Sequence, residues 1–115
     1  TAGLKGYAYV TAYCAAKHAV IGLVKSLATE LASTPITVNA VCPGFMETPM
    51  LEQSVANIVA KTGMSKDDAR ASLAKINPQN RLIQPEEVAE TVMWLASRQA
   101  ASITGQAISV SGGEI

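Results

Sequence analysis

The segment of residues 12–32 constrains the fold most, because it predicts one long helix that is apolar on nearly every side. Large aliphatic side chains recur at helical spacing along one stripe: Val20, Val24, Leu27 and Leu31. Neighbouring apolar residues widen this stripe, and the polar residues gather near Lys25, Thr29 and Glu30. A helix of this kind is buried on more than one face. We therefore expect one face to pack on a sheet and another on a partner helix.

The rest of the chain alternates between strand and helix signals. Residues 36–42 form an apolar run that predicts a buried strand, which Pro43-Gly44 ends. The other expected elements are helices over about 50–61, 66–76 and 85–97 and a last strand over 106–110, ended by Gly112-Gly113. This order is typical of a parallel α/β sheet. Because two strands cannot form such a sheet alone, we expect the chain to be one portion of a larger doubly wound sheet.

Two of the predicted helices begin with capping signals. Ser65 is followed three residues later by Asp68, which is the pattern of a helix N-cap. Pro85 suits a first helical position, and Glu86 and Glu87 place negative charge at the positive end of the helix dipole. Residues 77–84, between these helices, predict a loop.

Composition excludes several classes of partner. Nine basic and nine acidic residues balance, so no basic stripe indicates a nucleic acid, and no apolar run is long enough to span a membrane. Hydrophobic residues make up 49% of the chain and charged residues only 16%. We expect more of the same chain, or another subunit, to cover part of this apolar surface. The first residues lack an initiator Met and a signal peptide, which predicts that they are not a natural start.

The two cysteines and the single histidine give no metal site. Cys14 and Cys42 have neither zinc-site spacing nor a disulfide framework, which favours a reducing, cytoplasmic setting. Cys14 lies beside Tyr13, so a reactive thiol is an alternative to a small core residue. His18 is interpreted as a helix residue and not as a ligand or a base.

Tyr13 and Lys17 are the first candidate catalytic residues. Residues four apart lie on one face of a helix, so the phenol and the ammonium can meet. A nearby ammonium favours a phenolate, and such a pair can move a proton to or from a carbonyl or hydroxyl oxygen. A partly buried tyrosine beside a solvated lysine is the alternative. The Pro43-Gly44 loop leaves the carboxyl end of the predicted strand, where ligands bind in open α/β sheets; a simple turn is its alternative.

Five motifs occur in one order that resembles the C-terminal half of a short-chain dehydrogenase/reductase. They are Tyr13-x-x-x-Lys17, the run NAVCPGFMETPM from Asn39 to Met50, Pro85-Glu-Glu-Val-Ala, Ile103-Thr-Gly-Gln and Gly112-Gly113. The resemblance covers essentially all of residues 1–115. It implies a doubly wound, Rossmann-like parallel sheet and a catalytic and substrate-lid half, with the lid at about 50–81.

The resemblance also implies roles for particular residues. Tyr13 matches the catalytic acid/base, and Lys17 matches the lysine that assists it and bonds the nicotinamide ribose. The loop that lines the nicotinamide of NAD or NADP matches four residues: Pro43, Gly44, Met46 and Thr48. Members commonly assemble as tetramers through the helix with Tyr and Lys, which implies a homo-oligomer through residues 12–32.

Other parts of the family pattern are absent. The glycine-rich phosphate loop, the residue that sorts NAD from NADP and an upstream Asn motif do not occur. The catalytic serine would fall immediately before Thr1, and Ser111 replaces the usual acidic residue before the final Gly-Gly. We therefore expect residues 1–115 alone to lack dehydrogenase activity and to fold poorly.

The substrate class follows from resemblance as well. The segments 65–70 and 77–83 resemble members that act on 3-hydroxyacyl-CoA, 3-hydroxybutyrate or 3-oxoacyl thioesters. The predicted function is NAD(P)-dependent interconversion of a secondary alcohol and a ketone. The alternative is a catalytically incompetent fragment or a structural assembly module that lacks the nucleotide-binding half.

Overall fold

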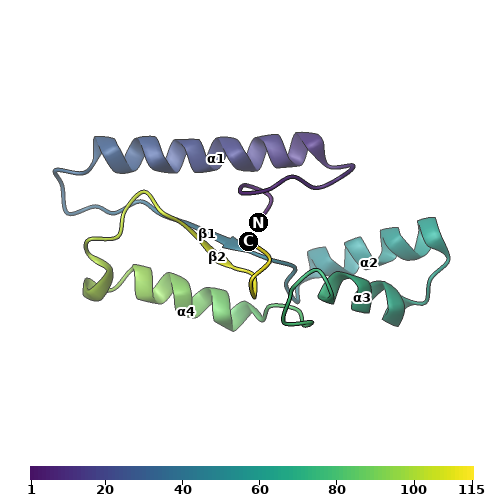
Figure 1. Ribbon diagram of the computed structural model, residues 1–115. Helices are drawn as coiled ribbons and strands as arrows, with labels where there is room; N and C mark the ends of the chain where they lie inside the picture. The colour runs from purple at the N-terminus through teal and green to yellow at the C-terminus, as the bar shows by residue number, and fades with distance from the viewer.

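The computed structural model describes all 115 residues as three layers, with a two-stranded sheet between helices (Figure 1). Helix α1 covers one face of the sheet and α4 covers the other, while α2 and α3 lie beyond the end of β1 (Figure 1). The elements are α1 (Thr11–Glu30), β1 (Ala40–Pro43), α2 (Pro49–Thr62), α3 (Lys66–Ala74), α4 (Pro85–Leu95), the 3-10 helix η1 (Arg98–Ala100) and β2 (Ala107–Val110). The expected α/β class is confirmed.

The two strands are parallel, but β1 is shorter than the predicted 36–42. Ala40 lies opposite Ala107 and Pro43 opposite Val110, so pairing extends over four residues. Upstream of Ala40 the pairing is irregular: the Val38 N–H donates to the Thr104 side chain at Oγ1, 3.0 Å away, while the Val38 carbonyl accepts from the Gly105 N–H at 2.7 Å. Pro43 was expected to break the strand and is its last residue, a position where the missing N–H is tolerated.

Helix ends differ from the predictions by one or two residues. The predicted helix 12–32 runs from Thr11 to Glu30, and a turn follows in which the Thr34 N–H donates to the Leu31 carbonyl at 2.8 Å. The helix expected to reach about residue 97 ends at Leu95 and is followed by η1. Local turn hydrogen bonds, which leave little trace in the apolar pattern, decide these ends.

Helix α1 is less buried in this chain than its apolar sequence predicts. Only Cys14 and Ala28 are buried, whereas Val20 is 48% exposed and Leu23 is 58% exposed. The face toward the sheet is therefore covered, and a second apolar face is open. No helix of the structure combines the length and the apolar character that crossing a membrane requires.

Helices α2 and α3 form a pair with its own small core. The core consists of Leu51, Val55, Ala69, Leu73 and Leu82. Phe45, which follows β1, packs against these side chains. The pair projects past the end of the sheet (Figure 1), and we call it the α2–α3 arm, residues 49–74.

The predicted capping residues begin α3 and α4. Ser65 Oγ accepts from the Asp68 N–H at 3.1 Å, as the sequence predicts. Pro85 begins α4, and the Gln84 N–H donates to Glu87 Oε2 at 2.8 Å. These bonds satisfy backbone groups that a helix end leaves open.

Replacing Ser65 by Ala is expected to destabilise the protein by about 1 kcal/mol, because the Asp68 N–H loses its acceptor. Urea unfolding measures the change. Ser54→Ala is the matched control, since Ser54 donates to the Met50 carbonyl inside α2 and caps no helix end. Equal destabilisation by both substitutions would contradict the assignment of Ser65 as a cap.

Candidate active site

Tyr13 and Lys17 lie on α1 close to its start. Helix α1 runs opposite in direction to β1, so its first turns lie on the side of the molecule where β1 ends (Figure 1). Lys17 Nζ is 5.4 Å from the centroid of the Tyr13 ring, and the Tyr13 side chain is 47% exposed. The predicted meeting of the two side chains is therefore present, as a cation–π contact that leaves the phenol accessible.

Residues 1–7 join the start of α1 to the loop after β1. Gly3 packs against α1 so closely that a Cβ there would lie 2.9 Å from the Lys17 carbonyl oxygen. Tyr7 stands edge-on to Phe45, with ring centroids 6.2 Å apart. The segment thus contacts both parts of the candidate site and fixes their relative position.

Residues 43–48 form the loop at the carboxyl end of β1. The Gly44 N–H donates to the Val110 carbonyl at 3.0 Å, and a Cβ on Gly44 would lie 3.2 Å from Ser111 Cα. A side chain at this position would therefore force its neighbours to shift by a few tenths of an ångström. At the end of the loop, Thr48 caps α2. Its hydroxyl donates to the Met46 carbonyl at 3.3 Å and accepts from the Leu51 N–H at 3.4 Å. Both hydrogen bonds of this hydroxyl are long, so a ligand could replace either of them at little cost.

The same loop is held from the other side by residues that follow the α2–α3 arm. The Ile83 N–H donates to the Phe45 carbonyl at 2.9 Å, and the Glu47 N–H donates to the Ile83 carbonyl at 3.1 Å. Met46 and Ile83 form an isolated parallel bridge. Ile83 is buried, so this attachment is shielded from water and rigid.

A polar cluster that no sequence pattern predicts lies beside Gly44. Tyr7 Oη donates to Glu114, and Lys5 Nζ lies 3.1 Å from Glu114 Oε1. The Glu114 side chain is 2% exposed, and its other oxygen has no hydrogen-bond partner. Burial, followed by the hydrogen bond to Glu114, raises the pKa of Tyr7 to about 12, so Tyr7 stays protonated at neutral pH. Glu114 follows Gly112-Gly113, and no sequence pattern there predicts its contact with Tyr7, which lies 107 residues earlier in the chain.

Burial of Cys14 fits a small core residue better than the reactive-thiol alternative. Both cysteines are free and buried, and burial raises the pKa of the Cys42 thiol. The neighbouring His18 donates from Nδ1 to the Cys14 carbonyl at 2.9 Å and not to a sulfur. This bond fits the interpretation of His18 as a helix residue.

Comparison with known proteins assigns the family. A family model described as enoyl-(acyl carrier protein) reductase matches residues 1–114. The chain belongs to the short-chain dehydrogenase/reductase family. The resemblance inferred from the motifs is thereby confirmed.

Two curated members of this family illustrate the similarity. The granaticin polyketide synthase putative ketoacyl reductase 1 of Streptomyces violaceoruber is 42% identical over 113 residues, which cover 98% of this chain and 42% of the relative. The 3-oxoacyl-(acyl-carrier-protein) reductase of Vibrio harveyi is 45% identical over 111 residues, which cover 96% of this chain and 41% of the relative. The chain thus spans about two fifths of the length of these relatives.

Solved structures of the family share the architecture. An actinorhodin polyketide ketoreductase variant crystallised with NADPH superposes with a TM-score of 0.92 at 42% identity, covering 97% of this chain and 43% of that one. A short-chain dehydrogenase family protein of Francisella tularensis gives 0.94 at 34% identity, covering 98% and 47%. The arrangement of α1, the sheet and the α2–α3 arm is therefore that of the family.

Proposed function

We propose that this chain is the catalytic half of an NAD(P)-dependent oxidoreductase that interconverts a secondary alcohol and a ketone. The observation that carries the proposal is the contact of Tyr13 with Lys17 in the first turns of α1. The start of α1 lies on the side of the sheet where β1 ends and the 43–48 loop follows (Figure 1). An accessible phenol beside an ammonium suits proton transfer to a substrate oxygen. Ligands of open α/β sheets bind at this edge.

The chain's own residues fit a nicotinamide nucleotide. Lys17 offers an ammonium for ribose hydroxyls, and Thr48 offers a hydroxyl held by two long bonds for the carboxamide. Pro43, Gly44 and Met46 would line the ring, with mainly the Met46 backbone in contact. When bound, the reduced cofactor supplies the hydride. In reduction, Tyr13 donates its hydroxyl proton to the carbonyl oxygen, and the same group takes that proton back in oxidation.

The substrate we propose is a 3-oxoacyl or 3-hydroxyacyl compound. Similar proteins carry names for this chemistry, among them the ketoacyl reductases above and a D-beta-hydroxybutyrate dehydrogenase of Rhizobium meliloti that is 36% identical. Residues 50–81 would serve as the substrate lid. They begin two residues after Thr48 and end two residues before Ile83, so the lid is tied to the nicotinamide loop at both ends.

We infer that residues 1–115 are the C-terminal part of one Rossmann-like domain in a cytoplasmic homo-oligomer. The two-stranded sheet would continue with strands of the remaining part. The exposed apolar face of α1, which includes Val20 and Leu23, would pack on a second copy through residues 12–32. NAD and NADP both fit the residues present, since none of them would contact the adenosine ribose.

The alternative is a structural assembly module without catalysis. The same exposed face of α1 favours it for residues 1–115 in isolation, because this face supports association without any cofactor. The two functions differ in one observable property, turnover by the full-length protein.

A reductase assay of the full-length protein tests the proposal. Acetoacetyl-CoA is offered with NADPH or NADH, and oxidation of the cofactor is followed by absorbance. We expect turnover with one cofactor clearly preferred, and no turnover by residues 1–115 alone. A well-folded full-length protein that oxidises neither cofactor with 3-oxoacyl thioesters or simple ketones would exclude the oxidoreductase and favour the assembly module.

A further inference from the structure

The α2–α3 arm reaches the rest of the molecule at few places. It projects past the sheet (Figure 1) and is joined to the body by the 43–48 loop at one end and by residues 77–84 at the other. Phe45 packs on the core of the arm, and Ile83 bridges to Met46. The position of α3 therefore depends on packing against α2 and on side chains that reach back toward the loop.

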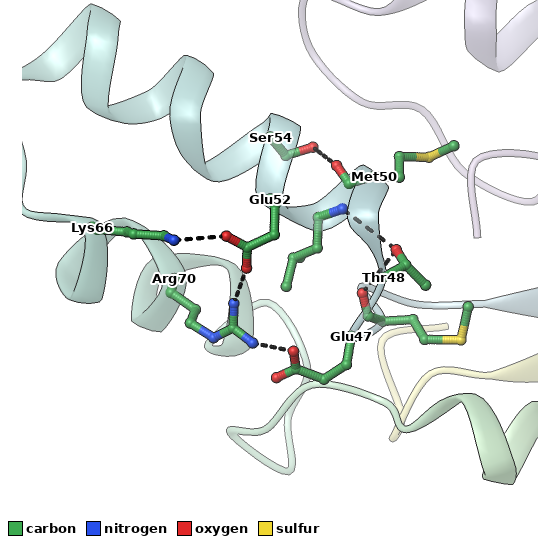
Figure 2. Close-up of polar contacts among 9 residues, drawn as sticks. Glu47, Thr48, Met50, Glu52, Ser54, Lys66 and Arg70 are labelled. Atoms are coloured by element: carbon green, nitrogen blue, oxygen red, sulfur yellow. Dashed lines mark hydrogen bonds and ion pairs between the residues drawn. The ribbon is translucent and has the colours of Figure 1, made fainter.

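Arg70 is the α3 side chain that reaches the loop. Figure 2 shows the Arg70 guanidinium between two carboxylates, with one nitrogen paired to Glu47 and another 2.5 Å from Glu52. Lys66 lies 2.9 Å from the other oxygen of Glu52 (Figure 2). Glu47 belongs to the loop after β1, whereas Glu52 and Lys66 both belong to the arm. Arg70–Glu47 is thus the ion pair of this network that joins the arm to the loop.

The loop end of this pair is fixed. The Glu47 backbone is held by its N–H bond to the Ile83 carbonyl, and Glu47 stands between Met46 and Thr48. Because the loop backbone is held in place, the Arg70 contact keeps α3 at one position relative to Glu47, and loss of the contact would free α3 without moving the loop. The ion pair therefore couples the arm to the two loop residues proposed to contact nicotinamide.

We propose that Arg70 is a positioning residue that latches the α2–α3 arm onto the nicotinamide loop through Glu47. The proposal rests on the proposed function for the role of the loop, while the latch itself rests on the geometry of Arg70 and Glu47. In this proposal Arg70 acts through Glu47 and not on the substrate or the cofactor directly. Its loss should loosen the arm and weaken binding in the site without removing the groups that transfer the proton.

The latch should respond to salt. The Arg70 and Glu47 side chains are each 33% exposed and border an open hollow that Asp67 and Arg81 also line. Such a pair is screened by mobile ions, because the Debye length falls from about 10 Å at 0.1 M salt to about 3 Å at 1 M. The Ile83 bridge is buried and uncharged, so it should be insensitive to salt.

Amide hydrogen exchange of the full-length protein tests the latch without any turnover. In Arg70→Gln we expect exchange of the α3 amides to rise about two- to fivefold at low salt, which is the range that partly exposed ion pairs support. Glu47→Gln removes only the pair that reaches the loop and leaves Arg70 paired with Glu52, so it should also raise exchange, and the double variant should add little to Arg70→Gln. Lys66→Gln is the matched control: it removes an ion pair of the same network that does not reach the loop.

Kinetics of the same variants supply the second readout. Arg70→Gln should raise KM about two- to fivefold with kcat within about twofold, and the difference from the parent protein should vanish in 1 M salt. Unchanged α3 exchange in both Arg70→Gln and Glu47→Gln would overturn the latch, as would an equal change in Lys66→Gln. A parent protein without turnover that still shows the exchange pattern would exclude the proposed function and keep the latch.

Discussion

Replacing Tyr13 by Phe in the full-length protein is expected to lower kcat by about 10²- to 10⁴-fold, which is the usual contribution of a positioned acid/base. Phe keeps the ring and its contact with the Lys17 ammonium, 5.4 Å from the ring centroid. Only the hydroxyl, which would donate the proton to the substrate oxygen, is removed. Steady-state kinetics with saturating cofactor measures the loss, and KM should change far less than kcat.

Tyr9→Phe provides the matched control for this loss. Tyr9 lies in the same segment, four residues before Tyr13, and its side chain is fully exposed. Removing its hydroxyl should leave kcat within about twofold, because the hydroxyl has no hydrogen-bond partner near the site. A Tyr13→Phe protein with kcat close to that of the parent would refute the role of Tyr13 as the acid/base.

Gly112→Ala is expected to destabilise the protein by about 3–5 kcal/mol through strain and lost hydrogen bonds. Gly112 has φ of +62°, and a Cβ there would lie 2.0 Å from Asn77 Oδ1. Asn77 is 2% exposed and cannot move freely. Its amide donates to the Arg81 carbonyl at 2.8 Å and accepts from the Gln79 N–H at 2.8 Å. Displacing Asn77 breaks both bonds, and thermal or urea unfolding measures the effect.

Gly63→Ala separates the backbone strain at Gly112 from the steric contact with Asn77. Gly63 ends α2 with φ of +71°, close to that of Gly112, but nothing lies within 4 Å of a Cβ placed there. Its replacement should cost only the left-handed backbone strain, about 1–2 kcal/mol. The difference between the two variants is the contact with Asn77. Equal destabilisation would show that this contact is unimportant.

Local sequence signals were sufficient to predict the helices and the residues at which they begin. The apolar stripe of residues 12–32 predicts α1 to within two residues, and Ser65 and Pro85 begin their helices as expected. These features depend on bonds between residues three or four apart, which is the range over which sequence spacing is informative. The strand 36–42 was predicted too long, because its length is set by a partner more than sixty residues away.

The candidate site likewise has one part that the sequence predicts and another part that it does not. Tyr13 and Lys17 could be paired from helical spacing alone, and the order of the motifs was enough to recognise the family. Three contacts could not be foreseen: Arg70 with Glu47, Glu114 with Tyr7, and Gly112 with Asn77. Each joins residues from segments distant in the sequence, and no periodicity or spacing encodes such a pair.

By itself, therefore, the sequence determined the α/β class, the family and the helix that presents Tyr13 and Lys17. Only the tertiary structure decided how tightly the loop after β1 is held. The physical reason is that the hydrogen bonds, ion pairs and close contacts around Gly44 and Glu47 come from segments distant in the chain, whose meeting depends on the packing of the whole fold.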